Sequence, residues 1–196
     1  VVKDVDEASI KAAAQDLIAQ GCDSVCLFFI NGYANTDNET KAARILRQVW
    51  PNDYVSVATE ILPEIREFER CSTASLNAYL QPVVANYLAR LETRIAEDDA
   101  GSEILIVQSN GGIMSVDTAK ALPVRTALSG PAAGVVAARQ IAKAAGFENV
   151  ITCDMGGTSF DVSLVADGQN MLTSQASIDF GMVIRTPMIE MSTIGA

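Results

Sequence analysis

No histidine occurs among the 196 residues of this sequence. That absence excludes Ser-His-Asp and Cys-His triads, histidine zinc sites and histidine general bases. Any catalysis must therefore rest on carboxylates, hydroxyls, backbone amides and a bound ion. The cysteines show no CxxC spacing, and we interpret them as small buried side chains of a protein in a reducing compartment, which predicts a cytoplasmic location. They are Cys22, Cys26, Cys71 and Cys153.

Basic residues are also scarce: 14 Lys and Arg stand against 24 Asp and Glu, for a formal net charge of −10. This balance argues against a nucleic-acid partner, because neutralising phosphates needs clustered Lys and Arg. The apolar share is 49%, but the apolar runs stay short, so we expect a soluble globular protein with no membrane span. The sequence opens with Val1 and without a signal-like segment, and we expect an internal piece of a longer protein.

Helices and strands alternate in the first third of the sequence. Periodic apolar residues predict a helix closed by Gly21, then a strand buried on both faces, a second helix and a second strand. Such an order is typical of an α/β sheet with parallel pairing. The predicted elements are Glu7–Gln20, Ser24–Ile30, Glu39–Trp50 and Tyr54–Ile61.

A long helix, Ser72–Ala96, follows, with a core-facing apolar stripe and with Pro82 inside it, which should kink the helix or reset its start. A strand, Glu103–Gln108, then runs into the glycine turn Ser109–Gly112. This turn is either one wall of a ligand cleft or a plain Asn-Gly turn, and the sequence alone favours the plain turn. A short helix is predicted over Ser115–Ala121.

A helix of small residues opens the last third of the sequence. We predict Ser129 as its N-cap, Pro131 near its first turn and Gly146 as its C-cap, so that its N-terminus can face an anion. Two strands follow, then a turn over residues 166–170 and a third strand, Met171–Gln175, which together form a meander. The tail, Gly181–Thr193, predicts two more strand-like runs around Pro187.

The two strands that follow this helix enclose the turn Asp154–Ser159. Apolar residues lead into Asp154, and a period-two strand follows the turn. Glycine amides can approach a phosphate closely, and Asp154 is placed to hold Mg²⁺ through water. An ordinary Gly-Gly hairpin with a solvated Asp161 explains the same pattern about as well.

Four motifs in order resemble the hydantoinase A / oxoprolinase family. They are Glu69–Thr73 with Asn77–Tyr79, Ser109–Gly112, Ser129–Gly134 and Asp154–Ser159. The resemblance implies an α/β fold of ribonuclease-H-like lobes, as in actin-like ATPases, with a mixed sheet flanked by helices. It also implies ATP and Mg²⁺ as cofactors and a second hydantoinase-type subunit or region as partner, and we expect an oligomer.

The reaction that the family implies is the ATP-dependent opening of a cyclic amide, a hydantoin or 5-oxoproline. Phosphorylation of the amide carbonyl oxygen turns it into a leaving group, and phosphoryl transfer asks the protein mainly for positioning and charge neutralisation. When the family's roles are carried over by position, the resemblance implies that Asp154 binds Mg²⁺ through water. It also implies that Asp154 and Asp161 are candidate catalytic residues. The cofactor-binding candidates are Gly156, Gly157, Thr158, Ser159, Gly130, Gly111 and Gly112.

The resemblance also implies domain boundaries. Residues 1–66 correspond to the end of the family's N-terminal region and residues 67–196 to the start of its catalytic region, with a lobe change near residue 128 and the second lobe from 129. Two positions depart from the family pattern. Phe160 stands where family members tend to have Thr, and Asn38 stands where they tend to have His, so no hydroxyl or histidine role transfers there.

Three alternatives stay open beside the cyclic amidohydrolase. The first is an ATP-dependent ketone carboxylase subunit, which shares every motif named above. The second is a non-catalytic, chaperone-like ATPase switch that signals to a protein partner. In the third, the protein is a structural α/β domain whose glycine turns are only turns.

Overall fold

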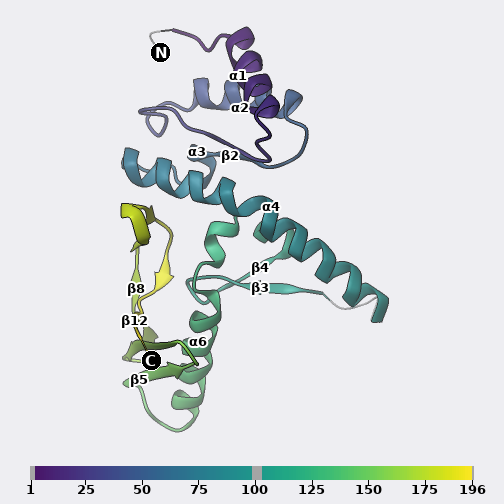
Figure 1. Ribbon diagram of the computed structural model, residues 1–196. Coiled ribbons are helices and arrows are strands. Elements are labelled where there is room, and N and C mark those ends of the chain that lie inside the picture. Colours follow the sequence, from purple (N-terminus) through teal and green to yellow (C-terminus); the bar gives the residue numbers. More distant parts are fainter. Residues whose placement is uncertain (1–2, 99–102, 196) are drawn as a thin grey trace. The chain divides into compact units, whose positions relative to one another are not determined.

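The computed structural model describes residues 3–98 and 103–195 and has a mixed α/β architecture (Figure 1). The chain forms two compact units. Unit 1 comprises residues 1–102, 120–124 and 177–185, and unit 2 comprises residues 103–119, 125–176 and 186–196. In the described part of the chain, no helix is long and apolar enough to cross a membrane. The predicted lobe change near residue 128 stays a prediction.

Unit 1 begins with two helices and two strands in alternation. The strands β1 and β2 pair in parallel, as predicted, with Val25 opposite Val55 and Leu27 opposite Val57. Their side chains form a core with Trp50 and with the apolar faces of the two helices. The elements are α1 (Glu7–Ala19), β1 (Val25–Leu27), α2 (Asp37–Val49), β2 (Val55–Val57) and α3 (Ala58–Ile61).

Local sequence explains the bounds of α1. The Asp6 side chain accepts a hydrogen bond from the Ser9 amide at 3.1 Å and caps the N-terminus, and Gly21 takes φ +81° just beyond the C-terminus. Both predicted strands are shorter than expected. Ile30 is 77% exposed and lies outside β1, and Ala58–Ile61 is a helical turn, so neither apolar run is a strand throughout.

The long helix α4 (Glu67–Asp98) begins earlier than predicted and continues through Pro82, so the helix does not restart there, and the kink given as the alternative stays a prediction. The predicted core-facing stripe is wrong in part, because Val83 and Tyr87 are 70% and 64% exposed. The buried face of α4 is instead strongly polar. Asn77 Nδ2 donates to Ser56 Oγ and to the Ala121 carbonyl at 2.9 and 3.0 Å.

Arg70, on the same helix, is fully buried in unit 1. Its Nη1 donates to Glu67 Oε2 at 3.1 Å, and its Nη2 lies 3.5 Å from Oε2 of Glu39, which is also fully buried. The guanidinium carbon lies 5.2 Å from the ring centre of Phe28 and 5.8 Å from that of Tyr33. This cluster, called the Arg70 node below, ties α2 and α4 to the segment that follows β1.

Unit 2 opens with the antiparallel hairpin of β3 (Leu105–Val107) and β4 (Ile113–Ser115), the second of which the sequence did not predict. Along the chain, the helix α5 (Val116–Ala121) and the 3₁₀ helix η1 (Pro123–Thr126) follow, of which residues 120–124 belong to unit 1, and then α6 (Ser129–Ala144). Ser129 is the first residue of α6 and not its N-cap. The N-cap is Leu128, at φ +58°, and it makes no side-chain capping bond, so the predicted cap is wrong. Gly146 takes φ +85° beyond the other end, as predicted.

A four-stranded antiparallel arrangement packs beside α6 (Figure 1). The strands β12, β6 and β5 lie in that order, and β7 pairs with the far end of β6. β5, β6 and β7 form an antiparallel meander, but the predicted third strand, Met171–Gln175, is wrong. β7 lies within the turn predicted over residues 166–170, and Leu172–Thr173 pairs with β11 instead. The strands are β5 (Val150–Met155), β6 (Ser159–Ala166), β7 (Gln169–Asn170), β8 (Leu172–Thr173), β11 (Met188–Ile189) and β12 (Ser192–Gly195).

The tail predicted as two strand-like runs contains three strands, β10 (Val183–Ile184), β11 and β12. Before it lie β9 (Ala176–Ser177) and the 3₁₀ helix η2 (Asp179–Gly181). The core of unit 2 joins α6 to β6 and β11 through Ala132, Val135, Val165 and Ile189. Small residues on α6 let it approach the sheet closely.

Candidate functional site

The hairpin of β5 and β6 divides its side chains between two faces. Asp154 lies opposite Asp161, Thr152 opposite Ser163, and Val150 opposite Val165. Directly opposed side chains share one face of a sheet, and Val165 belongs to the core built on α6. All six side chains therefore lie on the face toward α6, called the inner face below.

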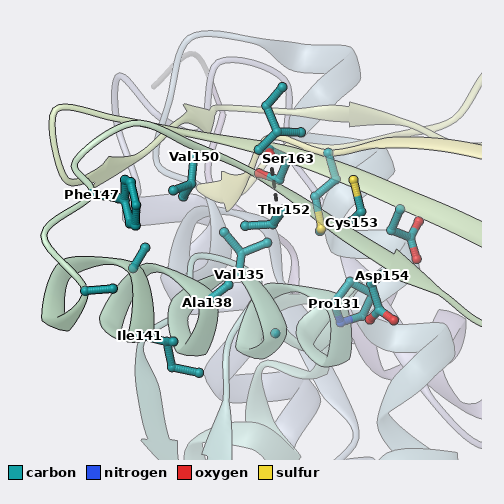
Figure 2. A pocket seen from close by; sticks show the side chains of 16 residues that line it. Pro131, Val135, Ala138, Ile141, Phe147, Val150, Thr152, Cys153, Asp154 and Ser163 are labelled. Carbon is teal, nitrogen blue, oxygen red and sulfur yellow. Dashed lines mark hydrogen bonds between the residues drawn. The ribbon is translucent and has the colours of Figure 1, made fainter.

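A groove of about 690 Å³ lies between α6 and this inner face. Figure 2 shows Asp154 beside Pro131 at the N-terminal end of α6, with Phe147 and Val150 toward the other end of the helix. The lining is polar near the carboxylates and apolar at the far end. It includes Pro131, Gly134, Val135, Ala138, Ile141, Phe147, Val150, Thr152, Asp154, Asp161, Ser163 and Met191.

The two carboxylates face each other across the strand pair and both line this groove. Like charges directly opposed across a strand pair destabilise it unless something compensates them. Asp161 has one compensating donor, since Thr193 Oγ1 lies 2.6 Å from its Oδ1. Asp154 is exposed, and its Oδ2 lies only 3.8 Å from where a Cβ on Gly134 would stand. A cation between the strands would relieve the repulsion.

The turn Gly156–Thr158 joins the two strands beside these carboxylates. The Gly156 amide donates to the Ser159 carbonyl at 3.0 Å, and the turn is exposed. Neither Gly156 nor Gly157 has a positive φ, and a Cβ would meet nothing within 4 Å at Gly157 and only the Ser159 carbonyl, at 3.9 Å, at Gly156. The fold itself therefore places no requirement for glycine at either position.

The other predicted glycines divide into two kinds. Gly130 directly precedes the groove residue Pro131, is exposed, and has open space where a Cβ would stand. Gly111 and Gly112 lie in the β3–β4 turn and are not among the residues that line the groove. Gly111 has φ +81°, and a Cβ there would lie 2.6 Å from Val136, so backbone and packing already explain it.

Sequence reasoning missed four residues that surround the carboxylates. Thr152 and Ser163 alternate with residues of the outer face, and this period-two pattern could have shown them. Gly134 lies within the motif Ser129–Gly134, but nothing in that motif marks it as a neighbour of Asp154. Thr193 comes from β12, whose pairing with β6 joins residues 32 positions apart, and no local signal predicts it.

Phe160 lies on the opposite face of the sheet from Asp161, so a side chain at this position does not point into the groove. The predicted burial of the cysteines is wrong for Cys22 and Cys153, which are exposed, and Cys26 and Cys71 are only half-buried. Among residues 3–98 and 103–195, no three His, Cys, Asp or Glu side chains cluster as metal ligands. A cation in the groove would therefore use two carboxylates and oxygen atoms from water or a ligand.

Two models of one protein family match this chain. The model for the hydantoinase/oxoprolinase family covers residues 70–196, and the model for its N-terminal region covers residues 1–50. The chain belongs to the hydantoinase/oxoprolinase family, as the motifs predicted.

The relatives include ATP-dependent enzymes. The chain is 35% identical over 192 residues to caprolactamase subunit alpha from Pseudomonas jessenii, spanning 98% of itself and 27% of that protein. It is 32% identical over 200 residues to 5-oxoprolinase from Saccharomyces cerevisiae, spanning 100% of itself and 15% of that protein. The acetone carboxylase beta subunit from Xanthobacter autotrophicus is 28% identical over 194 residues, which are 97% of this chain and 27% of that protein.

Solved structures agree with the sequence matches. The ATP-dependent caprolactamase from Pseudomonas jessenii superposes with a TM-score of 0.85 at 36% identity, over 97% of this chain and 28% of that chain. Nucleotide-free acetone carboxylase gives 0.81 at 27% identity, again over 97% of this chain and 27% of the other. The chain thus spans less than a third of the length of these relatives.

Proposed function

We propose that this chain supplies the second phosphate-binding turn and a magnesium site of an ATP-dependent cyclic amidohydrolase, within a longer polypeptide. Asp154 holds Mg²⁺ through water, with Asp161 beside it, and the amides and hydroxyls of Gly156–Ser159 hold phosphate oxygens. The remaining polypeptide supplies a first actin-like lobe with its own phosphate turn.

One observation carries this proposal: the turn next to the opposed carboxylates contains two glycines that neither packing nor backbone conformation requires. A glycine that the fold does not need is explained where a ligand has to approach the backbone closely. Gly157 and Thr158 are exposed, so a ligand can approach this part of the backbone.

The residues present suit both cofactors. Mg²⁺ prefers oxygen ligands, keeps several waters, and commonly binds through one or two carboxylates together with substrate phosphates. Asp154 and Asp161 provide two carboxylates, and Thr152 and Thr193 add hydroxyls nearby. ATP supplies the phosphoryl group that activates an otherwise unreactive amide carbonyl, and the protein contributes positioning and charge neutralisation.

A ketone carboxylase subunit is the second candidate. It is favoured by the similarity to acetone carboxylase, which reaches a TM-score of 0.81. The two candidates share the phosphate turn and differ in the molecule that receives the phosphoryl group. The groove is therefore the same for both candidates, and only the substrate that stimulates ATP hydrolysis distinguishes the amidohydrolase from the carboxylase.

The decisive experiment measures ATP hydrolysis by the full-length polypeptide with its partner subunit, screened against hydantoins, 5-oxoproline, caprolactam, and small ketones with bicarbonate. We expect stimulation by a cyclic amide. Stimulation only by ketone with bicarbonate would support the carboxylase, and stimulation only by a protein partner would support the chaperone-like switch.

Asp154→Asn tests the assigned site within the same assay. We expect at least a tenfold loss of ATP turnover and of Mg²⁺ affinity. Asp167→Asn is the matched control, because Asp167 is an exposed turn residue at the opposite end of β6, with φ +50°, which Asn adopts readily. Equal turnover by both variants would contradict the proposed site.

A second expectation is that the isolated 196 residues show no ATPase activity, and robust turnover by them would overturn the two-lobe interpretation.

A further inference from the structure

Thr193, Asp161 and Asp154 form one row across three strands. Register places Thr193 of β12 directly opposite Asp161 of β6, and Asp161 directly opposite Asp154 of β5. Directly opposed side chains lie on one face of a sheet, so a hydroxyl stands next to the carboxylate pair on the inner face. Both carboxylates line the groove beside α6, and Thr193 adjoins them from the strand on the other side of β6.

Two neighbouring hydroxyls on the inner face bond to the backbone. Thr152 Oγ1 donates to the Ser163 carbonyl at 3.3 Å (Figure 2). Ser163 Oγ donates to the Glu190 carbonyl at 2.7 Å, and Ser163 is buried. These bonds connect each strand to the segment beside it, so they give both hydroxyls a structural role.

The Thr193 hydroxyl differs because it bonds to a charged side chain. Thr193 Oγ1 lies 2.6 Å from Asp161 Oδ1, and an ionised carboxylate can only accept. Hydrogen bonds from a hydroxyl to a carboxylate at about 2.5–2.7 Å are roughly twice as strong as bonds between neutral groups. The backbone of β12 pairs with β6 along all 4 of its residues, so the strands do not need this side-chain bond in order to pair.

The bond fixes the orientation of the Asp161 carboxylate. Rotation about the last side-chain bond of an aspartate is only weakly restricted, so a carboxylate without a donor samples many orientations. Donation to Oδ1 selects one of them and leaves Oδ2 able to accept from a cation-bound water. The same donor offsets part of the repulsion between two directly opposed carboxylates.

We propose that Thr193 is the positioning residue of the cation site, an inference that rests on the proposed function. Its hydroxyl holds Asp161 beside Asp154, so that both carboxylates are oriented before a divalent cation binds. Thr193 acts through Asp161 and not on the nucleotide itself. Since Thr193 lies 32 positions after Asp161, the site is complete only when β12 has paired with β6.

Removal of this hydroxyl tests the role in the full-length polypeptide. The probe is Mn²⁺ without ATP, because oxygen ligands that suit Mg²⁺ also suit Mn²⁺, and the EPR signal of the free ion gives the affinity. Thr193→Val keeps the β-branched shape, and we expect the Mn²⁺ affinity to fall about tenfold, as is typical when the hydrogen-bond partner of a metal-binding group is lost. Thr193→Ser keeps the hydroxyl and should restore most of that loss.

Ser192→Ala is the matched control. Ser192 is the exposed neighbour of Thr193 on β12, and it lies opposite Val162 on the other face of the sheet. Its substitution also deletes a hydroxyl from β12, but we expect no change in Mn²⁺ affinity. An equal loss in Ser192→Ala and Thr193→Val would overturn the proposal, because the effect would then come from β12 as a whole.

A double variant separates positioning from a merely structural role. Asp161→Ala should weaken Mn²⁺ binding about tenfold or more, and adding Thr193→Val should cause little further loss, because the hydroxyl then has no carboxylate to hold. A full additional loss in the double variant would overturn the proposal. Unchanged affinity in Thr193→Val beside a loss in Asp161→Ala would contradict Thr193 alone, whereas unchanged affinity in Asp161→Ala would remove the magnesium site of the proposed function as well.

ATP turnover gives a second readout. In Thr193→Val we expect the half-saturating Mg²⁺ concentration to rise about tenfold, while turnover at saturating Mg²⁺ stays close to that of the unsubstituted protein. Loss of maximal turnover with an unchanged Mg²⁺ requirement would overturn the proposal, since the hydroxyl would then act on the reaction and not on the orientation of Asp161.

Discussion

Two glycines, one in each unit, stand in opposite environments. A Cβ on Gly32 would lie 2.4 Å from Glu39 Oε2, 3.0 Å from Arg70 Nη2 and 3.1 Å from the Phe29 carbonyl. A Cβ on Gly157 would meet nothing within 4 Å. The first glycine is required by a closely packed interior, and the second lies at an open turn that the fold leaves unconstrained.

The charged groups of the two units differ in the same way. Glu39 and Arg70 are fully buried, and Glu39 Oε1 accepts bonds from the Thr59 amide and hydroxyl at 2.8 and 3.0 Å. Asp154, by contrast, is exposed. Motifs of one family therefore have two physical roles. The motif Glu69–Thr73 contains Arg70 and stabilises the fold, whereas the motif Asp154–Ser159 is exposed and can be reached by a ligand.

Replacing Arg70 should change the stability of the chain more than any other substitution that tests this difference between buried and exposed charges. Arg70→Met leaves the Glu39 carboxylate buried without its cation, and we expect about 3–5 kcal/mol of destabilisation in urea unfolding of the chain. Arg47→Met is the matched control, because the Arg47–Glu60 pair is about half exposed and such pairs contribute about 0–1 kcal/mol. The double variant Glu39→Gln with Arg70→Met should recover part of the loss. Equal losses of unfolding free energy in Arg70→Met and Arg47→Met would mean that the buried Arg70 node stabilises the fold no more than a surface ion pair does.

Gly32→Ala should have the next largest effect. Thr59 holds the Glu39 carboxylate through Oε1, Glu39 is fully buried, and the Phe29 carbonyl belongs to the backbone, so an added methyl group forces a movement within a packed interior. Overpacking of this kind costs about 1–3 kcal/mol, and we expect the upper part of that range. Denaturant unfolding measures it, and a change below about 0.5 kcal/mol would mean that the loop relaxes freely.

The sequence predicted most of the elements because their signals are local. The glycines that follow α1 and α6 and the small-residue stripe of α6 depend on residues within a few positions. The predicted ends of helices and strands were wrong where contacts with distant segments decide where an element ends. The apolar run to Ile30 leaves the strand after Leu27, where the chain turns into the Arg70 node.

The candidate site was predictable only in part for the same reason. Asp154, Asp161 and the glycine turn lie on one hairpin, so a short motif contains them. Thr193 reaches Asp161 through a strand pairing that the sequence pattern does not specify. Motif membership also did not separate Arg70, a buried structural residue, from Asp154, because burial depends on the packing of distant segments.

Cysteine chemistry gives a third test of the contrast between the units. Burial in unit 1 raises the pKa of the Cys26 thiol to about 11 from its ordinary value of 9.0, with smaller contributions from Cys71 and Glu39. The unfolded chain loses this proton above pH 9, whereas the folded chain keeps it until about pH 11. Stability attributable to Cys26 is therefore fully present below pH 9 and falls by about 2–3 kcal/mol between pH 9 and pH 11. Cys26→Ala should lose less stability than the unsubstituted chain over that interval, and parallel pH profiles would contradict the assignment.

The smallest expected change in stability is at the open turn, where the effect on ligand binding should be the larger one. Gly157→Ala adds a methyl group to empty space, so we expect a stability change within about 0.5 kcal/mol, in contrast to Gly32→Ala. If phosphate oxygens approach this backbone, the same methyl group lies in their path, and the affinity of the full-length protein for Mg²⁺-ATP should fall about tenfold, which corresponds to about 1.4 kcal/mol. Calorimetric titration measures the affinity, with Gly168→Asn as a control that keeps a positive-φ turn residue at the far end of β6. Unchanged affinity in Gly157→Ala would mean that the open glycine serves neither the fold nor a phosphate, and the assignment of the turn would fail.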